Sequence, residues 1–495
     1  MLPISALSAL LAATLSIELV NAHDAHNAYL HRRQAAVAAA ASSSSSTSAA
    51  ASTGTATAAA PTGTTSAAAS SATYVGTGSY NVPPLASISS GMPTGPIPTL
   101  TATFTAGAVP TYSGAPPLPS AFAFNQANWP TLDVIPPTDS DEVKQWMQEL
   151  NGHNIPNITP TVDGECATDP QAVADAQSRG WWTCGGYTSG NDIVACPDKL
   201  TWGVSFDDGP APYSKLFQTY RCVDLALNSR HSSILKYLDD HDISATFFVV
   251  GSRVVSFPQI LVDEYMAGHE ISVHTWSHHP LTAMTNEQIV AELGWTRKAI
   301  QTVLGVTPTT MRPPYGDIDN RVRAISNAMG LRPIIWTTGP GGPFDTNDWR
   351  VAGGLHTGQE QFDIFQSILG NATQINTGFI VLEHDLFEIT VDLAVGYTLD
   401  AALSHNPKFN LESIGRCLKY PLNDMYKETA TINIVGANST SSIGSNSSVS
   451  SNGSNSTTGS TGASSSGGNG AAGLPLPSAF AGIIVAAVVV AVASL

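Results

Sequence analysis

Charged side chains are confined to one part of this 495-residue chain, which limits where a folded domain can lie. Residues 1–120 carry two acidic and two basic side chains, and no Asp, Glu, Lys or Arg follows Glu428. The formal charge of −17 therefore belongs to residues 121–428, a stretch long enough to bury one large core. Because like charges repel, so acidic a surface disfavours nucleic acid as a partner. No feature of the sequence indicates an obligate protein partner.

Composition divides the chain into a folded middle and two low-complexity ends. Residues 1–22 are mostly apolar and end in Val-Asn-Ala, as a secretory signal peptide does. Segments rich in Ala, Ser, Thr and Pro (23–120) or in Ser, Gly and Asn (429–470) bury too little apolar surface to become ordered. We therefore predict a disordered arm and a glycosylated stalk. The core is then residues 197–428, preceded by an extension over residues 121–196.

Residues 471–495 end in an uncharged apolar tail with no Lys or Arg after it. Small residues and a short polar spacer precede the tail, which predicts a glycosylphosphatidylinositol signal that is removed, with Asn469 as the attachment residue. A C-terminal transmembrane helix is the alternative, but it requires a topology opposite to that of a signal peptide. We therefore expect a secreted protein at the cell surface and cell wall, touching the plasma membrane only through its lipid anchor.

Six Asn-x-Ser/Thr sequons predict N-glycosylation of a secreted chain, and four of them fall in the C-terminal arm. The acceptors are Asn157, Asn371, Asn438, Asn446, Asn452 and Asn455.

Five cysteines are expected to oxidise in that compartment, and their odd number leaves one unpaired or in an intermolecular bond. Their spacing does not determine the pairing, although a bond between Cys196 and Cys417 would clamp the two ends of the core. The other three are Cys166, Cys184 and Cys222. No Cys-x-x-Cys pair occurs, which argues against a zinc cluster.

Short apolar runs alternate with amphipathic stretches between about Lys199 and Glu412, a pattern typical of β/α units and a parallel sheet. The longest predicted helix is Asn286–Leu304, with Thr285 as its N-cap and Gly305 after its end. Shorter helices are expected over 232–240 and 260–267. The predicted strands are 200–205, 245–250, 271–273, 309–311, 332–336 and 379–382.

Polar motifs follow the carboxyl ends of these strands, where α/β folds build their sites. SFDDGP ends a strand, so both of its carboxylates can turn to one side, and the histidines of HTWSH at i and i+4 share a face if the backbone is helical. The residues concerned are Asp207 and Asp208 in SFDDGP, His274 and His278 in HTWSH, Arg312 in RPPY, Asp345 and Asp348 in DTNDW, and His384 in LEHD.

Each motif alone has a plain structural interpretation, because Asp-Asp-Gly-Pro is usually a solvated turn and a lone histidine is usually structural. The combination indicates more. Two imidazoles and a carboxylate can bind a divalent cation, a second carboxylate can take a proton from water, and a separate histidine can protonate a leaving group. The set therefore indicates metal-assisted hydrolysis.

The five motifs resemble, in order, those of the polysaccharide deacetylase family, also called the NodB-homology or carbohydrate esterase family four domain. The resemblance covers roughly Pro197 to Leu418 and implies an α/β fold, a distorted (β/α) barrel with fewer than eight strands. With the arms, sequons and anchor signal, the chain is most similar to fungal chitin deacetylases of the cell surface. That implies hydrolysis of the N-acetyl groups of chitin polymers or oligomers to chitosan and acetate, in cell-wall remodelling.

The resemblance also implies a role for each motif residue. Asp207 would be the general base, steadied by Arg312, and His384 the general acid, oriented by Asp348 or alternatively Asp345. Asp208, His274 and His278 would bind the metal ion, for which zinc is the first choice and cobalt or another divalent ion the alternative. The Tyr315 backbone N–H would hold the oxyanion, and Trp349 and Leu382 would form the acetyl pocket.

Two alternatives remain open from the sequence. One is a deacetylase of another acetylated polysaccharide such as xylan. The other is a non-catalytic wall mannoprotein, for which a degraded site is expected.

Overall fold

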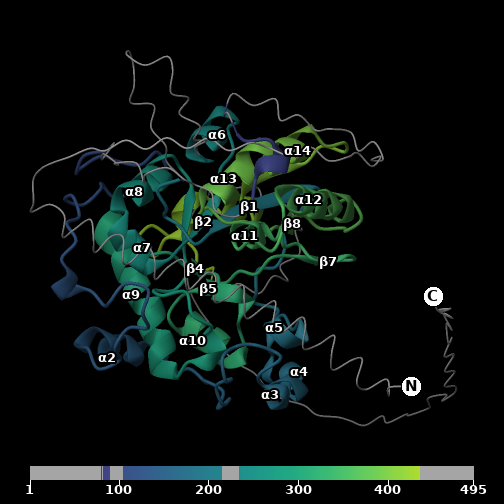
Figure 1. The fold of residues 1–495 in the computed structure, drawn as a ribbon. Helices are drawn as coiled ribbons and strands as arrows, with labels where there is room; N and C mark the ends of the chain where they lie inside the picture. Colours follow the sequence, from purple (N-terminus) through teal and green to yellow (C-terminus); the bar gives the residue numbers. More distant parts are fainter. Residues whose placement is uncertain (1–79, 81, 90–103, 214–233, 435–495) are drawn as a thin grey trace, which may run out of the picture. The chain divides into compact units, whose positions relative to one another are not determined.

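The computed structural model describes residues 80, 82–89, 104–213 and 234–434, all within the first of two compact units, residues 1–440 (Figure 1). No helix in these ranges is both long and apolar enough to cross a bilayer. Of the two sequons they contain, Asn157 is exposed, whereas Asn371 is half-buried. The predictions that lie outside the described residues are the signal peptide, the anchor signal, the attachment site Asn469, Cys222 and the sequons at Asn438, Asn446, Asn452 and Asn455.

A parallel sheet of seven strands forms the centre of the domain, in the order β5-β4-β3-β2-β1-β8, with β9 also paired to β1. All seven residues of β1 are buried, as expected for a parallel strand that is covered on both faces. The strands are β1 (Thr201–Asp207), β2 (Thr246–Val249), β3 (Glu270–Val273), β4 (Thr310–Met311), β5 (Arg332–Pro333), β8 (Phe379–Ile380) and β9 (Asn410–Ser413). A separate antiparallel hairpin joins β6 (Thr338–Gly339) and β7 (Gly342–Pro343).

Residues beyond β5 and β8 close the sheet into a ring. The Thr337 backbone N–H donates to the Ile380 carbonyl (3.0 Å), and the Leu382 N–H donates to the Phe344 carbonyl (2.9 Å). Because β5 pairs with β4, these contacts join the two ends of the strand order. The prediction of a distorted α/β barrel with fewer than eight strands is therefore confirmed, and the distortion lies where irregular residues complete the ring.

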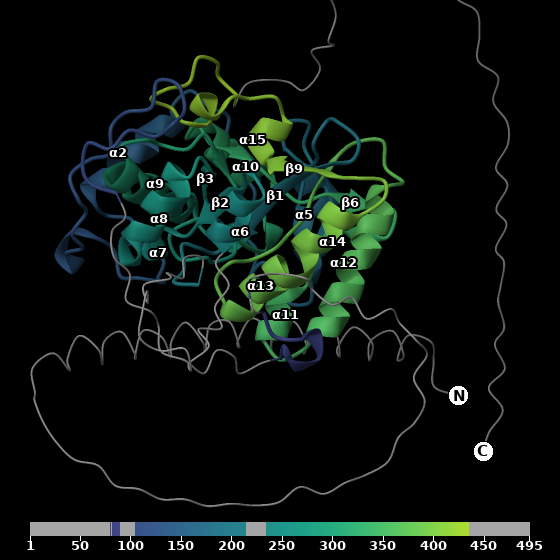
Figure 2. The same ribbon diagram turned by 90° about the horizontal axis from the view of Figure 1, so that it is seen from above.

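Helices lie on either side of the strands, with α7, α8 and α9 on one side and α12, α13 and α14 on the other (Figure 2). The α9 helix (Asn286–Leu304) has the predicted bounds because Thr285 and Gln288 form a capping box and Gly305 ends it with φ 81°. The other helices are α2 (Asp141–Met147), α3 (Pro170–Ala174), α4 (Ala176–Arg179), α5 (Trp182–Gly185), α6 (Ile234–Asp240), α7 (Gly251–Ser256), α8 (Pro258–Met266), α10 (Asn320–Ala328), α11 (Asp348–Ala352), α12 (Gly358–Ala372), α13 (Glu388–Leu393), α14 (Leu399–Ser404) and α15 (Ile414–Cys417).

Parts of the predicted arms pack against the domain. Leu85 and Ile88 are buried, and the Ile88 carbonyl accepts from the backbone N–H of Gly358 (3.1 Å). Leu118 and Ile434 are also buried. The prediction of a disordered arm over 23–120 is therefore wrong for residues 82–89 and 104–120, and residues 429–434 of the predicted stalk also belong to the described part of the chain. Composition missed these segments because a few apolar side chains per segment are enough to fill gaps on an existing core.

Two disulfides tie separated parts of the described chain together. Cys196–Cys417 joins residues 221 positions apart, and Cys166–Cys184 joins residues 18 positions apart. The first links the segment before β1 to α15, so it clamps the two ends of the core as that pairing requires.

Removing the Cys196–Cys417 disulfide is expected to destabilise the domain more than removing Cys166–Cys184. In the chain-entropy account, a disulfide's contribution grows with the length of the closed loop, and losing a native disulfide costs about 2–5 kcal/mol. The Cys196→Ser/Cys417→Ser variant should unfold at a lower guanidinium concentration than Cys166→Ser/Cys184→Ser, as followed by circular dichroism. An equal or smaller loss for the longer loop would show that loop entropy does not decide this stability.

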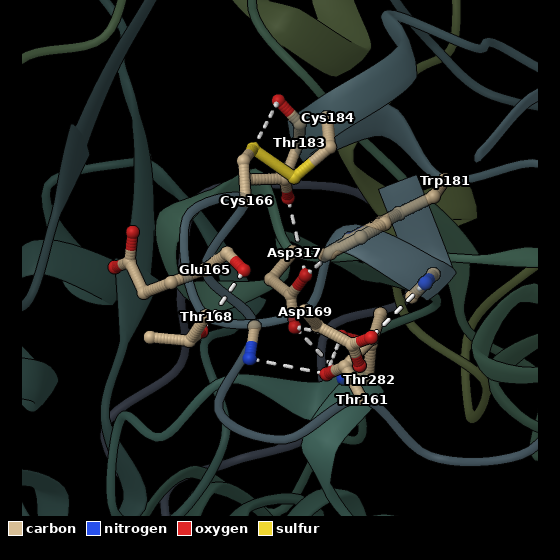
Figure 3. Close-up of a disulfide and its surroundings, with 12 residues drawn as sticks. Thr161, Glu165, Cys166, Thr168, Asp169, Trp181, Thr183, Cys184, Thr282 and Asp317 are labelled. Carbon is tan, nitrogen blue, oxygen red and sulfur yellow. Dashed lines mark hydrogen bonds between the residues drawn. A yellow bond between two sulfur atoms is a disulfide. The ribbon is translucent and has the colours of Figure 1, made fainter. Parts of the chain in front are cut away.

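The shorter disulfide closes a loop that docks beside two of the motifs (Figure 3). The Asp317 carboxylate accepts from Trp181 Nε1 (2.7 Å) and the Thr183 hydroxyl (3.1 Å) of this loop. It also accepts from the backbone N–H (2.8 Å) and hydroxyl (2.7 Å) of Thr282. Asp317 follows RPPY and Thr282 follows HTWSH in the sequence, so one buried carboxylate joins the N-terminal extension to both motif loops.

Candidate active site

The sheet brings the motifs to one edge. SFDDGP, HTWSH, RPPY and LEHD follow β1, β3, β4 and β8, and DTNDW follows the β7 hairpin strand. Because parallel strands end at the same edge, side chains more than 170 positions apart in sequence can meet there. The predicted placement of these motifs at strand ends is confirmed.

Both aspartates of SFDDGP serve the same edge because the chain turns between them. Asp207 is the last residue of β1, and Asp208 has a left-handed φ of 81°. Along a continuing strand their side chains would point to opposite faces. The turn is held by hydrogen bonds from the Asp208 N–H to the Phe248 carbonyl (3.1 Å) and from the Val250 N–H to the Gly209 carbonyl (2.8 Å).

Asp208, His274 and His278 form a cluster suited to a metal ion. All three are buried, and one donor atom from each lies within 4.8 Å of the others. Asp208 Oδ1 lies 3.0 Å from His278 Nε2 and 3.5 Å from His274 Nε2. Burial lowers the pKa of His278 to about 4, against the opposing effect of Asp208, so this imidazole is neutral at neutral pH. Neutral imidazoles and a carboxylate are ready metal ligands.

The two histidines do not meet on a helix. Residues 274–278 are irregular, and Thr275 and His278 have left-handed φ values of 64° and 57°. The helical explanation of the i, i+4 spacing is therefore wrong, although the two rings do lie together, with centroids 4.9 Å apart. A tight loop, not a helical face, sets their separation.

The hydrogen bond of His274 determines which ring nitrogen faces the cluster. Nδ1 lies 2.7 Å from the carbonyl oxygen of Arg312, and because a carbonyl only accepts, Nδ1 carries the proton. In the neutral ring, Nε2 then presents a lone pair towards Asp208 Oδ1. Two buried lone pairs that face each other repel unless a cation lies between them. The donor set and its second hydrogen bond therefore fit a divalent ion such as zinc.

Asp207 is paired with a fully buried arginine. Arg312 Nη1 donates to Asp207 Oδ1 (2.6 Å) and to the Ser205 hydroxyl (3.0 Å). The guanidinium also lies over the Phe248 ring at 4.0 Å, which fixes its plane. One carboxylate oxygen of Asp207 is thus held by the cation, and the other, Oδ2, lies 3.8 Å from His274 Nε2 at the edge of the metal cluster.

His384 lies directly opposite Asp207 across a parallel bridge. The Asp207 N–H donates to the Glu383 carbonyl (2.9 Å), and the Asp385 N–H donates to the Asp207 carbonyl (3.2 Å). Residues paired in this way project their side chains to the same face of the sheet. The carboxylate and the imidazole therefore flank one space.

Asp348 holds and charges His384. One Asp348 oxygen lies 2.7 Å from His384 Nδ1 and the other accepts from the His384 backbone N–H (2.8 Å). Burial alone would lower the pKa of His384, but the charge and hydrogen bond of Asp348, together with the charges of Asp208 and Asp207, outweigh it and raise the pKa to about 10. Asp345 instead accepts from the Asn347 N–H (2.8 Å). Of the two aspartates in DTNDW, Asp348 is therefore the partner of His384.

Comparison with known proteins agrees with this arrangement. The sequence profile of polysaccharide deacetylases matches residues 195–334. Chitin deacetylase 1 of Cryptococcus neoformans var. grubii is 48% identical over 380 residues, which is 76% of this chain and 76% of that protein. The chain belongs to the polysaccharide deacetylase family.

Two further comparisons concern this polysaccharide deacetylase. Chitin deacetylase 2 of the same organism is 33% identical over 322 residues, 61% of this chain and 62% of that protein. The structure of the chitin deacetylase from Colletotrichum lindemuthianum is 22% identical and covers 49% of this chain and 97% of that one, with a TM-score of 0.41. The resemblance drawn from the motifs is confirmed by the first relative, and the chain is a carbohydrate esterase that removes acetyl groups.

The remaining predicted residues of the deacetylase lie around the same motifs. Tyr315 is half-buried with a left-handed φ of 58°, and its hydroxyl lies 3.2 Å from His278 Nδ1. Trp349 follows Asp348 and donates its backbone N–H to that carboxylate (2.8 Å). Leu382 is buried two positions before His384. The oxyanion role of the Tyr315 N–H and the acetyl-pocket roles of Trp349 and Leu382 stay predictions.

Sequence reasoning missed one cation in the deacetylase site. Arg253 in α7 is buried, donates to the Asp208 carbonyl (2.6 Å) and lies 3.7 Å from Asp208 Oδ1. These two contacts orient Asp208, whose carboxylate belongs to the candidate metal cluster. The available signal was an arginine four positions after the buried strand β2, a place where an unpaired charge is costly.

Proposed function

We propose that this polysaccharide deacetylase hydrolyses the N-acetyl groups of N-acetylglucosamine residues in chitin, giving chitosan and acetate. The observation that carries the proposal is the pairing of Asp207, held by Arg312, with His384, held by Asp348, across one bridge. A carboxylate base and a charged imidazole acid thus flank one space beside the Asp208–His274–His278 cluster. The choice of chitin is supported by relatives named chitin deacetylases.

We propose that Asp208, His274 and His278 hold one divalent metal ion, with zinc favoured by the donor set. Such an ion, when bound, lowers the pKa of a water ligand and polarises a carbonyl oxygen. The backbone carbonyl of Arg312 fixes His274 by accepting a hydrogen bond from its Nδ1–H, and Arg253 fixes Asp208. These contacts orient the ligands before any substrate arrives.

The protein groups then divide the chemistry between them. Asp207 takes the proton of the water whose oxygen bonds to the acetyl carbon. The Tyr315 backbone N–H hydrogen-bonds the resulting oxyanion. His384 is positively charged at neutral pH because of Asp348, so it can donate its Nε2 proton to the amide nitrogen as the C–N bond breaks. Acetic acid and a free amine are formed, with one water proton on Asp207 and a neutral His384. The acid loses its proton to solvent as acetate leaves, and transfer of the Asp207 proton to His384 restores the starting charges.

Acetate release from N-acetylglucosamine oligomers, measured beside release from acetylated xylan, tests this proposal. We expect release from the oligomers to be the faster, to fall when a chelator removes divalent ions, and to return when zinc is added. Release from xylan alone would assign a different polysaccharide. Binding of chitin without acetate release from either substrate, at saturating zinc, would favour the wall-protein alternative.

We further propose that the enzyme acts at the cell surface, in remodelling of the wall. This location is supported by the sequence signals at residues 1–22 and 471–495 and by the sequons.

A further inference from the structure

The loop between the two histidine ligands has a backbone that needs outside support. Thr275 and His278 both have left-handed φ values, 64° and 57°, which residues other than glycine rarely adopt. The loop also sets the separation of the two imidazoles, so any relaxation of its backbone moves a ligand. The contacts that hold residues 275–277 therefore bear directly on the metal site.

The carbonyl groups of the loop are held by the start of α7. The Gly251 N–H donates to the Thr275 carbonyl (2.9 Å), and the Ser252 N–H donates to the Trp276 carbonyl (3.2 Å). Gly251 has no room for a side chain here, because a Cβ would lie 2.7 Å from the Trp276 ring. The loop thus rests closely on the helix that carries Arg253.

The N–H groups of the same loop are held by one buried carboxylate, Glu292 of α9. Glu292 Oε2 accepts from the backbone N–H of Trp276 (2.7 Å) and of Ser277 (2.9 Å), and Oε1 accepts from the Ser277 hydroxyl. The side chain is 0% exposed. Its neighbours along the helix, Ile289 and Leu293, belong to the apolar core.

Burying a carboxylate at position 292 costs free energy, and packing alone does not explain why the residue there is Glu. An apolar side chain would bury as well against the core, but it would leave two buried N–H groups of the loop without an acceptor. The Glu292 carboxylate accepts hydrogen bonds from Thr275, Trp276 and Ser277, which lie between the two histidines. Its contacts therefore serve the geometry of His274 and His278.

We propose that Glu292 is a positioning residue of the metal site, which fixes the separation and direction of the His274 and His278 imidazoles through the backbone between them. The inference rests on the proposed function in one respect, namely that these histidines bind a divalent ion. Glu292 touches neither that ion nor the substrate.

Zinc affinity of the full chain, measured by competition with a chromogenic chelator, tests the proposal. Glu292→Met removes the acceptor and keeps a similar volume, and we expect it to weaken zinc binding by about 10–100-fold, as loss of an outer-shell partner does. Glu292→Gln keeps an acceptor oxygen, so its affinity should stay within about threefold of the unmodified protein. The absorption spectrum of the cobalt-loaded protein should shift in Glu292→Met, because ligand geometry changes, and not in Glu292→Gln.

Glu270 offers a matched control at the other end of β3. It is also 0% exposed, burial raises its pKa to about 7 as it does for Glu292, and it accepts from the Thr246 hydroxyl (3.0 Å) and the Gly415 N–H (2.7 Å). Glu270→Met should therefore lose comparable stability and keep zinc affinity. An equal loss of affinity in both Met variants would overturn the proposal, since general loosening would explain it.

The remaining outcomes are also decisive. Zinc affinity unchanged in a folded Glu292→Met variant overturns the proposal. If that variant does not fold, Glu292→Asp withdraws the carboxylate by one methylene and should weaken binding about tenfold; unchanged affinity there is equally contrary. A parent protein that binds neither zinc nor cobalt would instead remove the metal site of the proposed function.

Discussion

Replacing Asp207 by Asn is expected to lower kcat/KM for acetate release from N-acetylglucosamine oligomers by about 10²–10⁴-fold, the usual contribution of a general base. The amide keeps the shape of the side chain and can still accept from Arg312, whose Nη1 lies 2.6 Å from Asp207 Oδ1. It cannot take a proton from water. The cluster of Asp208, His274 and His278 is unchanged in this variant, so zinc affinity should change little.

Asp192→Asn is the matched control for this substitution. Asp192 is buried, and it forms a similar ion pair with Arg323 (2.9 Å), away from the motifs. Both variants remove the charge from a buried Asp–Arg pair, so both should lose stability. Only Asp207→Asn should lose activity. A fall of less than tenfold in Asp207→Asn, with zinc bound, would remove Asp207 from the role of base.

Replacing Asp348 by Asn is expected to move the alkaline limb of the pH–rate profile towards acid. In the parent protein the pKa of His384 is about 10, so the charged acid is present below that pH and is lost as the pH rises through it. Without the Asp348 charge and hydrogen bond, the lowering effect of burial is opposed by the charges of Asp208 and Asp207, and the pKa of His384 falls. At a pH between the variant's pKa and about 10, the charged fraction, and with it kcat, should fall by up to about tenfold for each unit by which the pKa has dropped.

The same linkage predicts how the stability of the parent protein depends on pH. Because the folded-state pKa of His384 lies above the ordinary value of about 6.5, its pairing with Asp348 stabilises the fold fully below that pH and progressively less as the pH rises through about 10.

Asp345→Asn serves as the control for the pH–rate profile of Asp348→Asn, because Asp345 bonds to Asn347 and its replacement leaves the His384 contact with Asp348 intact. An unchanged alkaline limb in Asp348→Asn would mean that another group delivers the proton.

Local sequence patterns predicted the repeating part of this fold well. The bounds of α9 follow from a capping box at Thr285 and a glycine that accepts a left-handed conformation at residue 305. Six of the seven strands that the structure describes in the main sheet followed from apolar runs bounded by turn residues, within a few positions of their observed ends, whereas β9 was not predicted. The motif residues were recognisable because their chemistry is carried by side-chain type, which the sequence states directly.

What the local pattern could not predict depends on contacts between distant residues. The i, i+4 spacing of His274 and His278 would place both rings on one face of a helix, whereas the structure has a loop with two left-handed residues. Glu292 and the start of α7 supply hydrogen bonds to that backbone. Residues 82–89 likewise look disordered by composition but pack on α12 through Leu85 and Ile88.

Residue types and short-range spacing were therefore enough to predict the α/β class, the order of the motifs and the side chains available for hydrolysis. The long-range fold was needed to show that Asp208 turns to the same edge as Asp207, that Asp348 and not Asp345 pairs with His384, that Arg253 contacts Asp208 and that Glu292 contacts the loop between the histidines. Those outcomes depend on backbone torsions and on long-range hydrogen bonds. These torsions and hydrogen bonds depend on which strands and helices lie side by side, and a short stretch of sequence does not predict that arrangement.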